Sequence, residues 1–283
     1  MMIKSLVFGR GFGLYGHAVA LSELGCRVHF PLDYKSVVLS RIELKPYLAN
    51  IVYVAEPEKN VEDIDLVCLA RRPNDNVKLL NTLLDNGFSR NIVIEKPLGN
   101  SPESACRLLP IVNKYERWSI PYLFEYCDWF YELYKAVSEN KHIDIEWFHC
   151  QVNNPSSWKH NEKSGGGILS FYFVHLIALF KRLKPESPYS IDISNECITL
   201  TSDMFSGKFK LSEATLFKLK VDGYPVYVEP SPFGVIPKKG IRDPRVDALK
   251  IFYQKAVLGH DSPQSINFHE GVIDAWRKSS KDA

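Results

Sequence analysis

A glycine-rich segment near the N-terminus gives the strongest chemical signal in the sequence. It runs Gly9-Arg10-Gly11-Phe12-Gly13-Leu14-Tyr15-Gly16-His17, follows an apolar run and opens a helical pattern. Glycines in such a turn let the backbone approach a pyrophosphate, whose charge is stabilised by the N–H groups and positive dipole of the helix start. The segment therefore predicts a dinucleotide site that includes Gly9, Gly11, Phe12 and Gly13; the alternative is a glycine-rich turn without a ligand.

Asp33 lies at the end of the second apolar run. An acidic side chain about 20 residues after the glycines accepts hydrogen bonds from the ribose of a bound adenosine, which favours NAD. Tyr34, Lys35 and Ser36 follow directly, and a cation beside a hydroxyl can instead bind the 2′-phosphate of NADP. The sequence thus favours NAD, with NADP and a solvated turn as alternatives.

A lysine follows the fifth apolar run, in Glu95-Lys96-Pro97. In a doubly wound sheet the carboxyl ends of the strands are where ligands bind. A lysine at this edge can hydrogen-bond a reacting hydroxyl or carbonyl oxygen and pass a proton, while the proline restricts the turn that aims it. Alone these residues indicate a surface turn; their spacing from the glycine segment makes Lys96 a candidate catalytic residue.

Short apolar runs alternate with helical patterns over the first 126 residues. This rhythm predicts an α/β fold, an N-terminal Rossmann domain over residues 1–121 with a doubly wound parallel sheet. The expected strands are Ile3–Phe8, Arg27–Leu32, Ile51–Val54, Leu66–Ala70, Asn91–Glu95 and Tyr122–Tyr126. One expected helix carries Leu79, Leu80, Leu83 and Leu84 and ends at Asn86-Gly87; another begins at Ser101-Pro102.

Extended segments dominate the second half of the chain. They are expected at Ile143–Val152, Ser190–Thr201, Glu213–Lys220 and Tyr224–Val228, with one helical stretch after Gly165-Gly166-Gly167 and closing helices at 246–258 and 268–276. This pattern predicts a C-terminal α+β domain over residues 122–283 with an open, largely antiparallel sheet. The active site is expected in the cleft between the two domains.

Composition excludes several classes of protein. A hydrophobic fraction of 45% in 283 residues indicates a globular chain, and a net charge of +2 with dispersed Lys and Arg argues against a nucleic-acid partner. No apolar run reaches the roughly 20 residues that span a bilayer, and no signal-peptide pattern precedes the glycine turn, so a cytoplasmic protein without membrane attachment is expected. The cysteines show no C-x-x-C pair, so neither disulfides nor a metal site are expected: Cys26, Cys68, Cys106, Cys127, Cys150 and Cys197.

The motifs resemble, in their order, those of the Gfo/Idh/MocA family, the glucose-fructose oxidoreductase and inositol dehydrogenase group. The first-domain matches are the glycine segment with His17, the stretch Asp63–Ala70, and Glu95-Lys96-Pro97-Leu98. The second-domain match is Trp158, then Gly165-Gly166-Gly167, then His175. The resemblance covers residues 1–126 and 158–178, and the remainder only by general pattern.

This resemblance implies an NAD(P)-dependent oxidoreductase that transfers a hydride between the nicotinamide and a carbinol or carbonyl carbon of a sugar, cyclitol or nucleotide-sugar. Lys96 and His175 would handle the proton. The implied site adds Ala70, Arg71, Glu95 and Lys96 to the cofactor residues, and assigns to the substrate Lys96, Trp158, His160, Tyr172 and His175. The resemblance also implies a cis Lys96–Pro97 peptide and a homodimer or homotetramer.

Two sets of residues depart from the family pattern. Phe171 and Ala178 stand where relatives carry aspartates around His175, so neither position offers the imidazole a carboxylate. The alternative function is a catalytically silent relative that binds NAD(P) as a sensor or regulatory protein; the intact Lys96 and His175 favour the enzyme.

The second departure is Ala70-Arg71-Arg72-Pro73-Asn74-Asp75-Asn76, in which Asn76 replaces a family histidine. Its two guanidinium groups favour an anionic sugar, with exposed loop charges as the alternative. An aromatic set is interpreted as core rather than ligand site: Phe124, Tyr126, Trp129, Phe130, Tyr131 and Tyr134.

Overall fold

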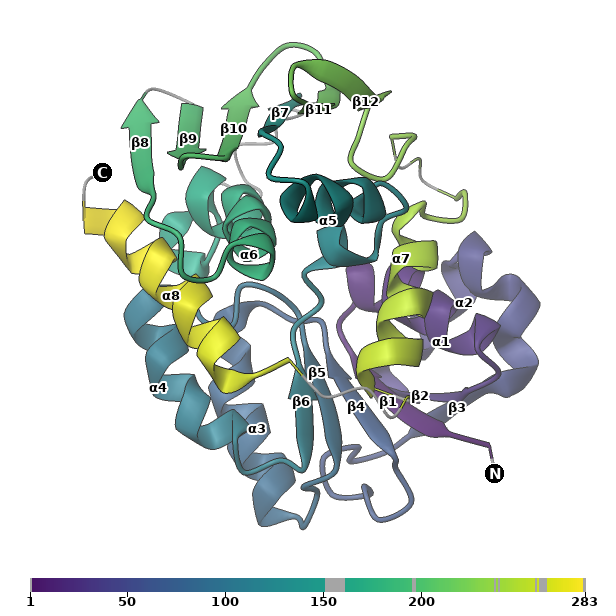
Figure 1. The fold of residues 1–283 in the computed structure, drawn as a ribbon. Helices are drawn as coiled ribbons and strands as arrows, with labels where there is room; N and C mark the ends of the chain where they lie inside the picture. Colours follow the sequence, from purple (N-terminus) through teal and green to yellow (C-terminus); the bar gives the residue numbers. More distant parts are fainter. Residues whose placement is uncertain are drawn as a thin grey trace. The chain divides into compact units, whose positions relative to one another are not determined.

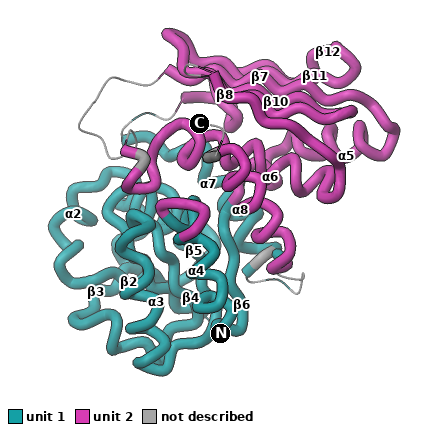
Figure 2. Tube along the Cα trace, turned by 90° about the vertical axis from the view of Figure 1, so that its left-hand side faces the viewer, with its two compact units in different colours: residues 1–99, 104–121, 237–264 teal, residues 100–103, 122–236, 265–283 magenta. Residues whose placement is uncertain are grey.

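The computed structural model describes residues 2–150, 161–194, 197–236, 238, 240–257, 259 and 264–281. The chain forms two compact units, coloured in Figure 2. The first consists of residues 1–99, 104–121 and 237–264, and the second of residues 100–103, 122–236 and 265–283. Both are therefore discontinuous in sequence, because residues 237–264 return to the first unit after the sheet of the second is complete.

The first unit is built on six parallel strands (Figure 1). They are β1 (Lys4–Phe8), β2 (Arg27–Pro31), β3 (Ile51–Val54), β4 (Leu66–Leu69), β5 (Asn91–Ile94) and β6 (Arg117–Ser119). Their order is β3-β2-β1-β4-β5-β6, which is that of a Rossmann sheet. The strand order reverses between β1 and β4, the switch point where such folds bind nucleotides. The predicted α/β class and parallel sheet are confirmed.

Helices follow most of the parallel strands of this unit. A π-helical turn, Gly13–Ala18, runs into α1 (Val19–Glu23), and the other α-helices between strands are α2 (Lys35–Ser40), α3 (Asn76–Asp85) and α4 (Pro102–Val112). The returning segment 237–264 adds α7 (Arg245–Phe252). Further 3-10 or π-helical segments lie at Leu32–Tyr34, Ile42–Asn50, Pro73–Asp75 and Tyr253–Val257. The leucine spacing predicted α3 correctly, and Gly87 at φ 81° follows its end, a conformation that glycine adopts without a Cβ clash.

The sixth predicted strand was wrong. Tyr122–Tyr126 was expected to be extended, but Leu123–Tyr126 is a helical turn and the sixth strand is Arg117–Ser119. Pro121 lies between them and has no N–H to donate to a strand ladder, so the sheet ends before it. The apolar residues that suggested a strand are buried in the second unit instead.

The second unit contains a six-stranded mixed sheet. Its strands are β7 (Ile143–His149), β8 (Ser190–Ser194), β9 (Cys197–Thr201), β10 (Phe205–Leu211), β11 (Leu216–Val221) and β12 (Tyr224–Glu229), in the order β12-β11-β7-β10-β9-β8. Only the β7–β10 pair is parallel among the pairings described. The open, largely antiparallel sheet is therefore confirmed.

Helices cover the apolar face of this sheet. The described ones are α5 (Phe130–Ser138), α6 (Val174–Leu183) and α8 (Ile266–Lys281), with a π-helical turn at Ile168–Phe173 before α6 and a 3-10 turn at Glu162–Ser164. Of the aromatic set interpreted as core, Phe124 and Trp129 are buried, but Tyr131 and Tyr134 are 69% and 64% exposed on α5, so that interpretation was wrong for these two. Among the described residues, no helix combines the length and apolar character that a membrane crossing requires.

Ion pairs at Glu23 attach the returning segment 237–264 to α1. Arg242 donates to the Glu23 carboxylate through Nε at 2.6 Å, and Lys250 donates through Nζ at 3.0 Å. Arg242 also binds Asp247, and the Tyr47 hydroxyl lies 3.2 Å from Glu23. The hydrogen bond from Arg242 is the main cause that lowers the pKa of Glu23 to about 2; burial opposes it and Lys250 adds to it.

Glu23→Gln is expected to lower the midpoint of thermal unfolding at pH 7. Because the pKa of Glu23 is lowered in the fold, its contribution is complete above the unfolded value of 4.5 and is lost as the pH falls towards 2. The difference between wild type and variant should therefore shrink over this range, measured by thermal unfolding at a series of pH values. Glu56→Gln, which breaks the exposed pair with Lys59, is the control and should have little effect. A pH-independent difference would contradict the assignment.

Candidate functional site

Three of the four glycines in the N-terminal segment are required by packing. A Cβ on Gly9, which has φ 143°, would lie 2.2 Å from the Ala70 carbonyl oxygen, and one on Gly13 would lie 3.2 Å from the Ala70 Cβ. A Cβ on Gly16 would meet the Phe12 ring at 2.2 Å. These glycines let the segment that follows β1 lie against the end of β4.

Gly11 differs from the other three glycines. No atom lies within 4 Å of the position that its Cβ would occupy, and the residue is exposed. Its backbone faces open space directly before the helix that begins at Gly13; its carbonyl oxygen accepts the Leu14 N–H at 2.9 Å, which leaves the N–H groups that precede Leu14 to face a ligand. This is the environment that a pyrophosphate requires, with room for close approach and N–H donors at a helix start.

The Phe12 side chain packs against the protein on the other side of this turn. Its ring lies beside Gly16, and the Arg245 guanidinium carbon is 4.1 Å from the ring centroid. Asp243 accepts two hydrogen bonds from Arg245, at 2.8 and 2.7 Å. The Phe12 ring is therefore packed against the protein, and the Phe12 backbone is the part that can contact a ligand. Through Arg245, α7 packs against the glycine segment on the side of this ring.

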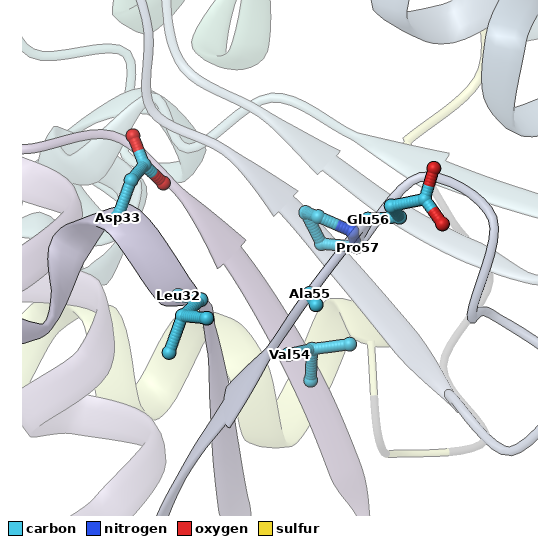
Figure 3. A pocket seen from close by; sticks show the side chains of 6 residues that line it. All are labelled: Leu32, Asp33, Val54, Ala55, Glu56 and Pro57. Atoms are coloured by element: carbon cyan, nitrogen blue, oxygen red, sulfur yellow. The ribbon is translucent and has the colours of Figure 1, made fainter.

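Asp33 lies at the carboxyl end of β2 and is exposed. Its carboxylate pairs with Arg10 of the glycine segment, whose guanidinium carbon is 4.8 Å from the centroid of the Tyr34 ring. Next to it is a pocket of about 390 Å³ (Figure 3), lined by Leu32, Asp33, Val54, Ala55, Glu56 and Pro57. Two carboxylates, those of Asp33 and Glu56, thus stand at a pocket that is otherwise apolar.

The end of β4 carries the predicted residues Ala70 and Arg71. Ala70 donates its N–H to Phe8 at 2.7 Å, which holds it against the glycine segment. Arg71 is partly buried and 3.9 Å from Asp75, whereas Arg72 is exposed. Asn76, at the start of α3, is fully buried, and within the described structure neither its amide nitrogen nor its amide oxygen has a hydrogen-bond partner.

Glu95 and Lys96 follow β5 at the same sheet edge. The Glu95 N–H donates to Leu69 at 2.9 Å and so continues the pairing of β5 with β4. Both side chains are partly exposed, and the Lys96–Pro97 peptide is cis, as the resemblance implies. The predicted cofactor residues Gly9, Gly11, Gly13, Ala70 and Glu95 thus lie at adjoining strand ends, since β1, β4 and β5 are neighbours.

A buried histidine behind this edge, in the π-helical turn Gly13–Ala18, links Glu95 to Tyr253. His17 Nε2 lies 2.8 Å from Glu95 Oε1, and Nδ1 lies 2.6 Å from the Tyr253 hydroxyl. Burial lowers the pKa of His17, but Cys68 and Glu95 raise it by more, so that it reaches about 10. Tyr253 was not singled out from the sequence, where it stands in an apolar helical stretch without a local motif.

In the second unit, His175 lies in the first turn of α6 and is 8% exposed. Its ring is stacked on Phe124, with centroids 5.0 Å apart and planes 21° apart. Tyr172 is equally buried and stacks on Phe209 at 5.1 Å, so its ring belongs to the core. Of the departing positions, Phe171 is partly exposed and Ala178 is buried. The predicted substrate residues Trp158 and His160 lie outside the described residues.

The sequence by itself matches no protein-family model. It also matches no curated protein. Solved structures do match over nearly the whole chain. One is the WlbA (WbpB) dehydrogenase from Thermus thermophilus in complex with NAD and UDP-GlcNAcA, at 16% identity and a TM-score of 0.70, covering 98% of this chain and 94% of that one.

Two further structures show the same similarity. A myo-inositol dehydrogenase from Lactobacillus casei, in complex with NAD(H) and myo-inositol, has 16% identity and a TM-score of 0.70 and covers 100% of this chain and 95% of its own. GenD2 from gentamicin A biosynthesis, in complex with NAD, has 13% identity and a TM-score of 0.72 with coverages of 100% and 94%. At such identities the similarity establishes the fold. The chain therefore has the fold of the Gfo/Idh/MocA-type dehydrogenases, the group that its motifs resemble.

Proposed function

We propose that this protein is an NAD(P)-dependent oxidoreductase that acts on a hydroxyl or carbonyl group of a sugar, cyclitol or nucleotide-sugar. The observation that supports this most strongly lies within the first unit. Gly11 lies beside open space at the switch point after β1. Lys96 follows β5, on the same edge of the sheet and on the other side of the switch point. A pyrophosphate site and a proton-carrying lysine on one edge are the two elements that hydride transfer to a carbon–oxygen group needs.

The residues of the first unit fit a nicotinamide dinucleotide. Gly11 and the helix start provide space and N–H donors for the pyrophosphate, and Asp33 provides the ribose acceptor. When bound, the nicotinamide supplies or accepts a hydride. Glu95 and Lys96 stand at the end of β5, on the side of β1 away from Asp33, and so serve the nicotinamide half.

Lys96 is the proposed proton carrier. Its amino group hydrogen-bonds the reacting oxygen; the ammonium form would give that oxygen a proton when a carbonyl is reduced, and the neutral amine would take one from it when a hydroxyl is oxidised. His175 of the second unit is the proposed second acid/base or substrate ligand. Phe171 and Ala178 offer it no carboxylate, and the stack on Phe124 helps to fix the plane of its ring.

Two observations support the proposed substrate class. The solved neighbours include complexes with UDP-GlcNAcA and with myo-inositol. In this chain, Arg71 and Arg72 follow β4, where planar guanidinium groups suit a phosphate or carboxylate. An anionic or nucleotide-linked sugar is therefore proposed ahead of a neutral one, acted on by a cytoplasmic homodimer or homotetramer.

The test is titration of the protein with NADH and with NADPH by isothermal calorimetry, followed by a screen of inositols and nucleotide-sugars for turnover. Saturable binding of NADH and turnover of one of these substrates is the expected result. Binding without turnover of any of them would favour the sensor or regulatory protein, and binding of neither nucleotide would overturn the proposal.

Arg10→Gln is expected to raise the preference for NAD over NADP. The Asp33 carboxylate disfavours a 2′-phosphate, whereas Arg10 pairs with Asp33 and offers that phosphate a cation. Removing the guanidinium should weaken NADPH binding about tenfold and change NADH binding much less. Lys78→Gln, which removes an exposed cation of α3, is the matched control. An unchanged ratio of the two dissociation constants would show that the pair does not govern cofactor choice.

A further inference from the structure

A line of buried polar groups runs from the returning segment 237–264 to the turn that carries Lys96. The Tyr253 hydroxyl lies 2.6 Å from His17 Nδ1, and His17 Nε2 lies 2.8 Å from Glu95 Oε1. His17 and Tyr253 are both 0% exposed. Glu95 is the residue directly before Lys96, so the line ends at the proposed proton carrier.

Such an arrangement is costly unless every member is satisfied. The buried imidazole and phenol lose their hydration and the carboxylate loses part of its own, and an apolar set of the same size would pack this position without that cost. Here one ring nitrogen of His17 is hydrogen-bonded to the Glu95 carboxylate and the other to the Tyr253 hydroxyl, so both ring nitrogens have a partner and the ring is held in one orientation. The network therefore specifies the orientation of the Glu95 side chain.

The attachment of segment 237–264 does not depend on this network. Arg242 and Lys250 already bind Glu23, and Arg245 packs on Phe12 of the glycine segment. Tyr253 is distinct because its polar group reaches, through His17, a residue that faces the sheet edge. Packing of segment 237–264 alone would not require a polar connection to the Glu95 carboxylate.

We infer that Tyr253 and His17 are positioning residues for the nicotinamide half of the cofactor site, which they act on by holding Glu95 and with it the Lys96 turn. This inference rests on the proposed function. Asp33 lies at the end of β2 and Glu95 at the end of β5, on opposite sides of the switch point between β1 and β4. Disrupting the network should therefore weaken binding of the nicotinamide half of the cofactor and leave binding of the adenosine half unchanged.

The experiment compares two ligands that share the adenosine half. The dissociation constants of NADH and of ADP-ribose, which lacks the nicotinamide, are measured by calorimetry for wild type and Tyr253→Phe. The variant keeps the ring and loses one buried hydroxyl, so NADH should bind about fivefold more weakly and ADP-ribose should bind unchanged. Tyr115→Phe is the matched control, because Tyr115 is also buried in this unit and its hydroxyl donates to the Leu80 carbonyl at 2.8 Å. It should change neither constant.

Each result decides the inference. Equal weakening of both ligands in Tyr253→Phe, or no weakening of either, would overturn it, because a merely structural contact predicts one of these. His17→Gln provides a second variant should Tyr253→Phe unfold, and the same selective loss of NADH is expected from it. A wild-type protein that binds neither ligand would instead overturn the proposed function, and the inference with it.

Discussion

Gly11→Val is expected to abolish nucleotide binding without disturbing the fold. No protein atom lies within 4 Å of the position of the new Cβ, and the backbone there is not in the left-handed region that side chains avoid. The valine would instead occupy the space through which a pyrophosphate must approach the helix start at Gly13. We expect the affinity for NADH to fall by about 100-fold or more, with an unchanged unfolding temperature.

Two other glycine substitutions separate binding from stability. Gly9→Ala would place a Cβ 2.2 Å from the Ala70 carbonyl oxygen at φ 143°, so its loss of binding should be accompanied by a large loss of stability. Gly271→Ala in α8 meets only a Lys181 side-chain atom at 3.7 Å, so it should leave binding unchanged and stabilise the helix slightly. If Gly11→Val binds NADH with the wild-type affinity, the dinucleotide does not bind at this turn.

The parallel sheet was predictable because its inner strands are continuous apolar runs. Strands buried on both faces need no polar alternation, and β1 and β4 carry such runs next to the glycine segment and the Arg71 loop. The bounds of β3 were predicted without error. The short β6 gave no such signal, since three residues ending before Pro121 are too few to form a pattern.

The second sheet was less predictable because its strands pair in ways that the sequence does not encode locally. β10 lies between β7 and β9, yet Phe205–Leu211 was not expected as a strand: Phe205, Phe209 and Leu211 do alternate with polar residues, but Gly207 interrupts the apolar side of the pattern. The extended segment expected at Ser190–Thr201 is in fact two antiparallel strands, β8 and β9.

The candidate site also has one part whose position could be predicted from the sequence and one part that could not. Gly11, Asp33 and Lys96 were predictable because each follows a strand, so their positions depend on chain order alone. The contacts that support them were not. Tyr253 reaches His17 across 236 positions of sequence, and Arg245 reaches Phe12 from the same returning segment. Contacts between residues so far apart leave no local periodicity, and only the folded chain reveals which side chains hold the glycine turn and Glu95 in place.

Lys96→Met is expected to reduce turnover about 1,000-fold while NADH still binds, since methionine keeps the length of the side chain but can neither hydrogen-bond the reacting oxygen nor carry a proton. Lys96→Arg is a second variant that separates binding of the oxygen from proton transfer. A guanidinium can still bind the oxygen, yet it does not give up its proton at neutral pH, so Arg should restore substrate affinity but not the rate. Both variants are compared with wild type in kcat and KM on the substrate found in the turnover screen. Turnover of Lys96→Met within tenfold of wild type would remove Lys96 from the reaction and leave His175 as the remaining candidate for the proton.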